Sequence, residues 1–338
     1  MPLSPEIEDR PVFLGGIPRS GGAVLCRLLD RHPDLLVHPC QTGFFSTFVP
    51  AAAKLTNDRR IPLAERTLLR CAPEDRDDAP ADAVELDHAA VRKRFSERLL
   101  GSTMLLSDYL SSAILSIADV SGTLNERQRL WVEPTSFSEL HAGRIFEWWR
   151  HARLIQIVRD PRAVFAAAQR PFGEASSIAA FAQEWLTSAR RARRNLSTFG
   201  EGRCLTVHYE QLVRAPATQF SQILAFLGLE AGRVDPQPLG GAGRQFAPGR
   251  TAGDEQFAQI GASAVDAWKS ELQPAQIALL EAHLTDEMRA HGYVPITSPS
   301  PLRRMRLLAD RFMIPTRRHG RGMKSAKPSD RDSGKATR

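Results

Sequence analysis

Short apolar runs alternate with longer stretches of mixed apolar and polar residues along most of the chain. Five runs predict buried β-strands, at residues 11–15, 35–37, 130–132, 153–158 and 204–207, and the run at 153–158 is the clearest. Because strands that alternate with helices form a parallel sheet covered on both faces, the pattern predicts a three-layer α/β fold with a central parallel sheet.

The stretches between these runs have the spacing of helices. The predicted helices span residues 23–30, most of 44–121 apart from a charged break at 72–83, 137–150, 161–170, 177–197, 216–227, 262–271 and 274–290. Residues 230–253 are rich in Gly and Pro and predict a loop.

The charge is unevenly distributed along the 338 residues. The formal net charge is +7, but residues 301–338 alone carry 12 Lys and Arg against 3 Asp and Glu. We therefore predict one domain at residues 8–297, followed by a basic, largely disordered tail at 298–338. The tail is compatible with peripheral contact to an anionic membrane, or with a simple solvated segment. The near-neutral body gives no indication of a specific nucleic-acid partner.

The N-terminus, the lengths of the apolar runs and the cysteines bear on the location of the protein and on its metal content. The first ten residues are not those of a secretory signal, and no run of 18 apolar residues occurs. The four cysteines are scattered, without paired or metal-ligand spacing. These observations predict a cytoplasmic protein with reduced cysteines, no disulfide framework and no metal site.

A glycine-rich loop joins the first predicted strand to the first predicted helix, in the sequence Phe13-Leu-Gly-Gly-Ile-Pro-Arg-Ser-Gly-Gly22. Such a loop directs backbone N–H groups and a helix N-terminus at one point, which suits phosphate or sulfate oxygens. Arg19 adds a planar cation. No Lys follows Gly21, so the Walker A pattern is incomplete and a Mg²⁺-dependent P-loop kinase or triphosphatase is disfavoured. An anion-free glycine turn is the alternative interpretation.

A second group of charges follows the strand at 153–158. Arg159 ends that strand, and Arg162 lies in the first turn of the next helix. Ligands of parallel sheets bind beyond the carboxyl ends of the strands, so Arg159 can face the same crevice as the glycine loop. A structural ion pair between Arg159 and Asp160, or another acidic residue, is the alternative.

Together these motifs resemble the PAPS-dependent sulfotransferases, in particular the branch with tyrosylprotein and carbohydrate enzymes; PAPS is 3′-phosphoadenosine 5′-phosphosulfate. The loop, with Leu28-Leu-Asp-Arg-His-Pro33 behind it, resembles the family's 5′-phosphosulfate loop. Arg159-Asp-Pro-Arg-Ala-Val164 resembles its 3′-phosphate motif. Further matches extend the resemblance over about residues 11–294: Tyr209-Glu-Gln-Leu212, Phe226-Leu-Gly-Leu229, Trp268-Lys269 and Gly292-Tyr293.

The resemblance implies a P-loop-like fold and transfer of a sulfuryl group from PAPS, as co-substrate, to a hydroxyl or amine. It implies an acceptor such as a carbohydrate, a lipid or a small metabolite, and no metal. The residues expected to bind the cofactor are Pro18, Arg19, Ser20, Gly21, Gly22, Arg159 and Arg162, and Arg19 is also expected to act in catalysis.

Several positions depart from the family pattern. Gly22 and Ala23 replace two threonines, and Ala167 replaces a serine. Gln41 stands where the acceptor-activating glutamate is expected, and an amide cannot serve as a general base. We therefore predict His38 as the catalytic base, with Glu133 as the second candidate. A noncatalytic relative that binds PAPS or its product is the alternative.

Overall fold

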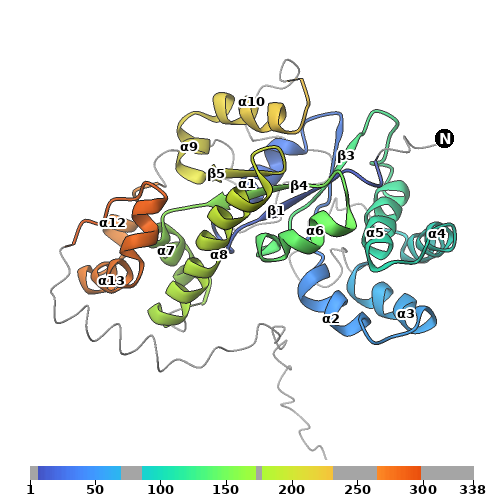
Figure 1. Ribbon diagram of the computed structural model, residues 1–338, viewed down its shortest axis with the longest axis horizontal. Coiled ribbons are helices and arrows are strands. Elements are labelled where there is room, and N and C mark those ends of the chain that lie inside the picture. Colours follow the sequence, from blue (N-terminus) through green and yellow to red (C-terminus); the bar gives the residue numbers. More distant parts are fainter. Residues whose placement is uncertain (1–6, 70–85, 173–176, 231–264, 298–338) are drawn as a thin grey trace, which may run out of the picture.

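The computed structural model describes residues 7–69, 86–172, 177–230 and 265–297 (Figure 1). Its centre is a five-stranded sheet with the strand order β2-β3-β1-β4-β5. The strands are β1 (Pro11–Gly15), β2 (Leu35–Val37), β3 (Leu130–Glu133), β4 (Arg153–Val158) and β5 (Cys204–His208). All four neighbouring pairs are parallel. This confirms the predicted α/β fold with a central parallel sheet.

The strands form because both of their faces are buried. All five residues of β1 are buried; Phe13 belongs to one hydrophobic cluster with Trp131, whereas Val12 and Leu14 belong to another. Successive side chains of a strand point to opposite faces, so the continuous apolar run supplies both helix layers.

Helices cover both faces and extend beyond the two edges of the sheet. The helical elements are α1 (Gly22–Leu29), η1 (Phe44–Phe48), α2 (Val49–Ala52), α3 (Asn57–Thr67), α4 (His88–Leu100), α5 (Leu106–Val120), η3 (Ser138–His141), α6 (Ala142–Trp148), α7 (Pro161–Phe172), α8 (Ile178–Phe199), α9 (Tyr209–Arg214), α10 (Pro216–Phe226), α12 (Trp268–Glu271) and α13 (Pro274–Ala290). In Figure 1, α3, α4 and α5 gather at one end of the molecule, and α12 and α13 lie beside α7 at the other.

Two of the differences between the structure and the predicted helices occur at residues with left-handed backbone. Residues 137–150 were predicted as one helix, but Phe137 has a φ of +67°, and a 3₁₀ helix, η3, precedes the shorter α6. The segment from Phe44 begins as a π-helix after Gly43, which has a φ of +62°. In both places a left-handed residue redirects the chain, which periodicity alone does not reveal. Much of the predicted loop at 230–253, and the whole tail at 298–338, lie outside the described residues.

The cysteines correct one expectation. Cys40 is disulfide-bonded, whereas Cys26 and Cys204 are free and buried. The prediction of wholly reduced cysteines is therefore wrong at Cys40. Disulfides persist mainly in oxidising compartments, so this bond weighs against the cytoplasmic location, which stays a prediction. None of the described helices is long and apolar enough to cross a membrane.

Candidate functional site

The parallel sheet brings the residues singled out in the sequence to one edge. The glycine loop follows β1, His38 follows β2, Glu133 ends β3, and Arg159 follows β4. Because all strands run in the same direction, these positions share the carboxyl edge of the sheet, where ligands of open α/β folds bind.

Backbone geometry explains the glycines of the loop. Gly16 and Gly21 have φ values of +126° and +107°, in the region that side chains rarely adopt. A Cβ on Gly21 would lie 2.3 Å from Cδ2 of Tyr209, and one on Gly16 would lie 2.5 Å from the carbonyl oxygen of Ile157. Arg19 also has a left-handed backbone, with a φ of +71°, and its side chain is exposed. The loop therefore depends on these glycines and turns Arg19 outward.

The loop delivers unpaired amides at the start of α1. Its N-cap residue, Gly21, makes no side-chain capping bond, and the first helical hydrogen bond runs from Leu25 N to Gly21 O. The N–H groups of residues 22–24 therefore have no acceptor within the helix. A Cβ at Gly22 would meet nothing within 4 Å, so the space beside these amides is open. Such an arrangement fits an anionic group of a nucleotide. The Ser20 hydroxyl already donates to Ile17 O, at 2.6 Å.

Arg159 links the two sequence motifs. Its Nη1 donates to the carbonyl oxygen of Arg19, at 3.1 Å, and its guanidinium carbon lies 4.2 Å from the centre of the Tyr209 ring. The indole Nε1 of Trp185 donates to the Arg159 carbonyl, at 3.0 Å. The guanidinium is therefore held on an aromatic face next to the glycine loop.

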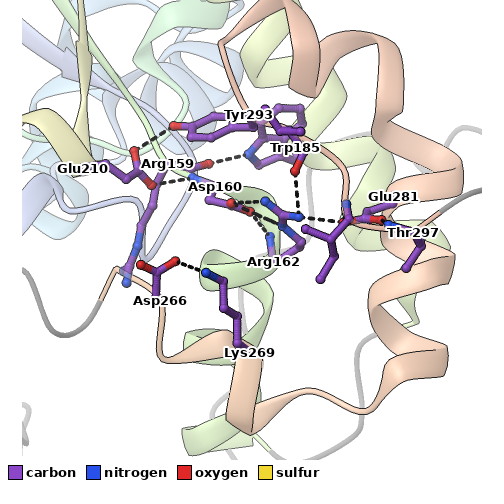
Figure 2. Close-up of polar contacts among 12 residues, drawn as sticks. Arg159, Asp160, Arg162, Trp185, Glu210, Asp266, Lys269, Glu281, Tyr293 and Thr297 are labelled. Carbon is purple, nitrogen blue, oxygen red and sulfur yellow. Dashed lines mark hydrogen bonds and ion pairs between the residues drawn. The ribbon is translucent and has the colours of Figure 1, made fainter.

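Arg162, which the sequence predicts to bind the cofactor, is buried among protein groups. It is 4% exposed, and Figure 2 shows its guanidinium between Asp160 and Glu281. Its Nη2 lies 2.6 Å from Oδ2 of Asp160, and its Nη1 lies 2.6 Å from Oε1 of Glu281. Its guanidinium carbon also lies 4.0 Å from the centre of the Trp268 ring. Asp160 and Glu281 therefore form ion pairs with the Arg162 guanidinium on two sides.

Glu210, in the Tyr-Glu-Gln-Leu motif, holds the backbone of the second motif. One carboxylate oxygen accepts a hydrogen bond from Asp160 N, and the other accepts one from the hydroxyl of Tyr293, both at 2.9 Å (Figure 2). Burial raises the pKa of Glu210, and the Asp160 amide partly opposes this shift. The motif match pointed to this glutamate, but its partners are 50 and 83 residues away in the sequence.

The two candidate bases differ in their surroundings. His38 is 2% exposed, and its Nε2 has no hydrogen-bond partner among the described residues. Burial lowers the pKa of His38 to about 4, so the ring is neutral at pH 7. Glu133 is 1% exposed and accepts hydrogen bonds from the hydroxyls of Thr42 and Thr135 and from both backbone amides. Burial raises the pKa of Glu133, and the bonds from Thr135 and Thr42 oppose the shift.

Gln41 lies beside the same segment, because its Oε1 accepts a hydrogen bond from Ser136 N, at 3.3 Å. Sequence reasoning missed another buried carboxyl, that of Glu139, which accepts a hydrogen bond from Gly16 N. Within the described residues, no three His, Cys, Asp or Glu side chains are grouped to hold a metal ion.

Comparison with known proteins identifies the family. The sulfotransferase family model matches residues 11–233. Protein-tyrosine sulfotransferase 1 of Danio rerio is 25% identical over 302 residues, covering 86% of this chain and 75% of that protein. Protein-tyrosine sulfotransferase 2 of Gallus gallus is 22% identical over 297 residues, covering 85% and 70%. The sulfotransferase domain of the Synechococcus PCC 7002 olefin synthase has a similar fold, with a TM-score of 0.52, 21% identity, and coverage of 86% and 96%. This chain therefore belongs to the sulfotransferase family.

Proposed function

We propose that this protein transfers the sulfuryl group of PAPS to an acceptor hydroxyl and releases adenosine 3′,5′-bisphosphate (PAP). The observation that carries the proposal is the pairing of two anion-binding elements at one sheet edge. The unpaired amides at the start of α1 form one element, Arg159 forms the other, and the bond from Arg159 to Arg19 O joins them. Their combination suits a nucleotide with anionic groups at both its 3′ and 5′ positions.

Each loop residue has a role in this proposal. Arg19 and the amides after Gly21 bind the 5′-phosphosulfate, Pro18 and the Ser20 hydroxyl shape the turn, and the absent Cβ of Gly22 leaves room for the ligand. Arg159 binds the 3′-phosphate. Arg162 holds the segment that bears Arg159 in place rather than binding the nucleotide, because Asp160 and Glu281 already neutralise the charge of Arg162.

The chemistry requires the acceptor oxygen and the leaving oxygen to lie in line with the sulfur. The acceptor O–S bond forms as the bond from sulfur to the 5′-phosphate oxygen breaks, and the acceptor proton passes to a base. Arg19 and the α1 amides stabilise the negative charge of the transferring group and of the leaving phosphate. These groups supply the stabilisation that Mg²⁺ supplies in P-loop triphosphatases.

We propose His38 as the base, with Glu133 second. Neutral His38 has a buried Nε2 without a hydrogen-bond partner among the described residues, whereas Glu133 must give up several hydrogen bonds to accept a proton. The low pKa of about 4 makes His38 a weak base. That weakness, with Gln41 at the usual position of the glutamate, favours the second candidate function, a protein that binds PAPS or PAP without transferring sulfate.

The curated relatives are protein-tyrosine sulfotransferases, so we propose the phenolic hydroxyl of a peptide tyrosine as the first acceptor to test. The acceptors expected from the sequence, namely carbohydrates, lipids and small metabolites, form the comparison set.

Calorimetry with PAP, and with ADP plus Mg²⁺, tests the nucleotide proposal. PAP should bind more tightly than ADP, because ADP has no 3′-phosphate for Arg159. Arg19→Ala and Arg159→Ala should each weaken PAP binding by about 1.5–3 kcal/mol, the range for charged hydrogen bonds. The exposed Arg194, on α8, supplies a control, and Arg194→Ala should bind PAP like the wild type. Equal binding of ADP and PAP would contradict the proposal.

Transfer from labelled PAPS to tyrosine peptides and to the comparison set tests catalysis. His38→Ala should lower kcat by about 100-fold or more, with unchanged affinity for PAP. Gln41→Glu should retain or raise the rate, because it restores a carboxylate beside Ser136. If His38→Ala keeps full activity, the base assignment fails and Glu133 becomes the candidate. If wild type and Gln41→Glu bind PAP but transfer to no acceptor, the noncatalytic function is favoured.

A further inference from the structure

Glu139 is a buried carboxyl group in direct contact with the glycine loop. It lies in η3 and is 0% exposed. Its Oε2 accepts a hydrogen bond from Gly16 N, at 2.7 Å, although the two residues are 123 positions apart in the sequence. Its Oε1 accepts a hydrogen bond from the hydroxyl of Ser188 in α8, at 2.6 Å. The carboxyl group therefore bridges the loop and a helix of another part of the chain.

A buried polar network holds Glu139 in place. The side-chain amide of Asn195 donates to the Glu139 carbonyl, at 2.8 Å, and to Oε1 of Gln156 in β4, at 2.7 Å. The Gln156 amide in turn donates to the carbonyl oxygen of Ala192, at 3.3 Å. The network joins η3, β4 and α8 beneath the loop, so Glu139 rests on rigid elements rather than on another loop.

The fit between Glu139 and the loop is tight. A Cβ on Gly15 would lie 2.5 Å from Oε2 and 2.8 Å from the backbone nitrogen of Glu139. The next residue, Gly16, has its φ of +126° while its N–H points to the carboxyl group. Two successive glycines, Gly15 and Gly16, therefore allow the start of the loop to pack directly on Glu139. This contact fixes the direction of the residues that follow.

We propose that Glu139 is a positioning residue for the anion-binding loop, acting through Gly16 to set the direction of the amides and of Arg19. This inference rests on the proposed function, because it assigns the loop to the 5′-phosphosulfate. The Gly16 N–H is already bonded to the carboxyl group, so it does not contact the ligand. The loop amides after Gly21 and the cation of Arg19 carry the anion instead.

Two substitutions of Glu139 separate the effect of its hydrogen bonds from the effect of its charge. In Glu139→Gln, the amide oxygen can accept from Gly16 N and the amide NH₂ can donate to the Ser188 hydroxyl, so both bonds survive. Burial raises the pKa of Glu139, opposed by the Ser188 bond, which is consistent with a role that does not require a charge. Glu139→Ala removes both bonds and leaves the buried Gly16 N–H without an acceptor.

Two measurements on the full chain test the inference. The first is the dissociation constant for PAP, by calorimetry. The second is amide hydrogen exchange of peptides covering residues 13–22, in the absence of nucleotide. Glu139→Ala should weaken PAP binding by about tenfold and speed exchange of these peptides by about tenfold. Glu139→Gln should resemble the wild type in both. Ser188→Ala, which removes one of the two bonds, should lie between them.

Glu287 provides a matched control. This buried glutamate of α13 forms ion pairs with Arg190 and Arg193, which lie on the side of α8 that faces away from the loop contacts. Glu287→Gln therefore loses ion pairs without changing any contact of the glycine loop. It should leave PAP affinity and exchange of residues 13–22 unchanged, even if its melting temperature falls. If the role of Glu139 is purely structural, Glu139→Ala should also have a lower melting temperature with unchanged PAP affinity and unchanged exchange of residues 13–22.

The outcomes separate the two proposals. If the wild type does not bind PAP, the proposed function fails. The contact between Glu139 and the loop is then still tested by comparing amide exchange of residues 13–22 in the wild type and in Glu139→Ala. If the wild type binds PAP and Glu139→Ala binds it equally well, the positioning role is wrong. If Glu139→Ala does not fold, Ser188→Ala decides, and wild-type affinity and exchange in that variant overturn the inference.

Discussion

At the residue scale, the site is marked by polar atoms that burial has separated from water. His38 has a buried nitrogen without a partner among the described residues, Glu133 and Glu139 have fully engaged carboxyl groups, and Arg162 lies between two acids. Such groups cost stability unless they are paired, and Glu133, Glu139 and Arg162 all have hydrogen-bond or ion-pair partners. Of these groups, only His38 has an atom, Nε2, without a hydrogen-bond partner in the part of the chain that the structure describes.

The lowered pKa of His38 predicts a pH-dependent stability. The unfolded chain binds a proton near pH 6.5, whereas the folded chain does so only near pH 4. Between these values the unfolded state holds more protons, so the contribution of His38 is intact above pH 6.5 and is lost as the pH falls towards 4. At about 1.4 kcal/mol per pKa unit, the loss is about 3 kcal/mol.

Urea unfolding of wild type and His38→Asn at several pH values measures this contribution. The stability difference between the two proteins should be constant above pH 6.5 and should shift in favour of the variant below it. The pKa of His141 is also lowered to about 4, mainly by burial, so His141→Asn is the matched comparison. A stability difference between wild type and His38→Asn that does not change with pH would show that His38 titrates normally. If His38 is the base, kcat should likewise fall near pH 4 rather than near 6.5.

At the scale of elements, hydrogen bonds and an ion pair link α7, which follows Arg159, to α13 and to the segment after α13. Arg162 in α7 pairs with Glu281 in α13, and Glu281 also accepts hydrogen bonds from the backbone amides of Ile296 and Thr297. The Arg162 guanidinium donates to the carbonyl oxygen of Val294. The segment 293–297 is thus attached to the motif that bears Arg159, 134 or more positions earlier in the chain.

Arg162→Ala should destabilise the nucleotide-free protein by about 3–5 kcal/mol, because it leaves Asp160 and Glu281 buried without a counter-charge. Urea unfolding without ligand measures the effect. Arg190→Ala is the control: its side chain is 52% exposed and its pair with Glu287 is partly solvated, so its loss should cost at most about 1 kcal/mol. A small effect of Arg162→Ala on stability, with a large effect on PAP affinity, would restore the direct ligand role expected from the sequence.

At the scale of the whole molecule, a near-neutral body carries a strongly basic C-terminal segment. Residues 301–338 hold nine more basic than acidic side chains, with several apolar residues among the first of them. This composition favours salt-sensitive attraction to anionic lipid, although a solvated tail remains the alternative.

Flotation with vesicles that contain or lack anionic lipid tests the tail. The full chain should float with the anionic vesicles at low salt and be released at high salt. A version ending at Thr297 keeps the hydrogen bonds of that residue to Glu281 and should remain unbound. Identical behaviour of the two proteins would leave the tail as solvated charge.

The fold class, the sheet edge that holds the site and the family could all be predicted from the amino-acid sequence. Strands β1, β2 and β4 and helix α13 have the predicted bounds, because a buried run or an amphipathic helix is written in local periodicity. The loop and Arg159 were found for the same reason: a glycine turn after a strand and a charge at a strand end are local signals.

The surroundings of Arg162, Glu139 and His38 follow from the packing of the chain and could not be predicted. The sequence predicted Arg162 as a cofactor ligand and His38 as the catalytic base, and it placed Glu139 within a predicted helix without marking it as a site residue. Their partners lie far along the chain, such as Glu281 for Arg162 and Gly16 for Glu139. Burial and pairing are properties of the packed chain, and no local pattern contains them.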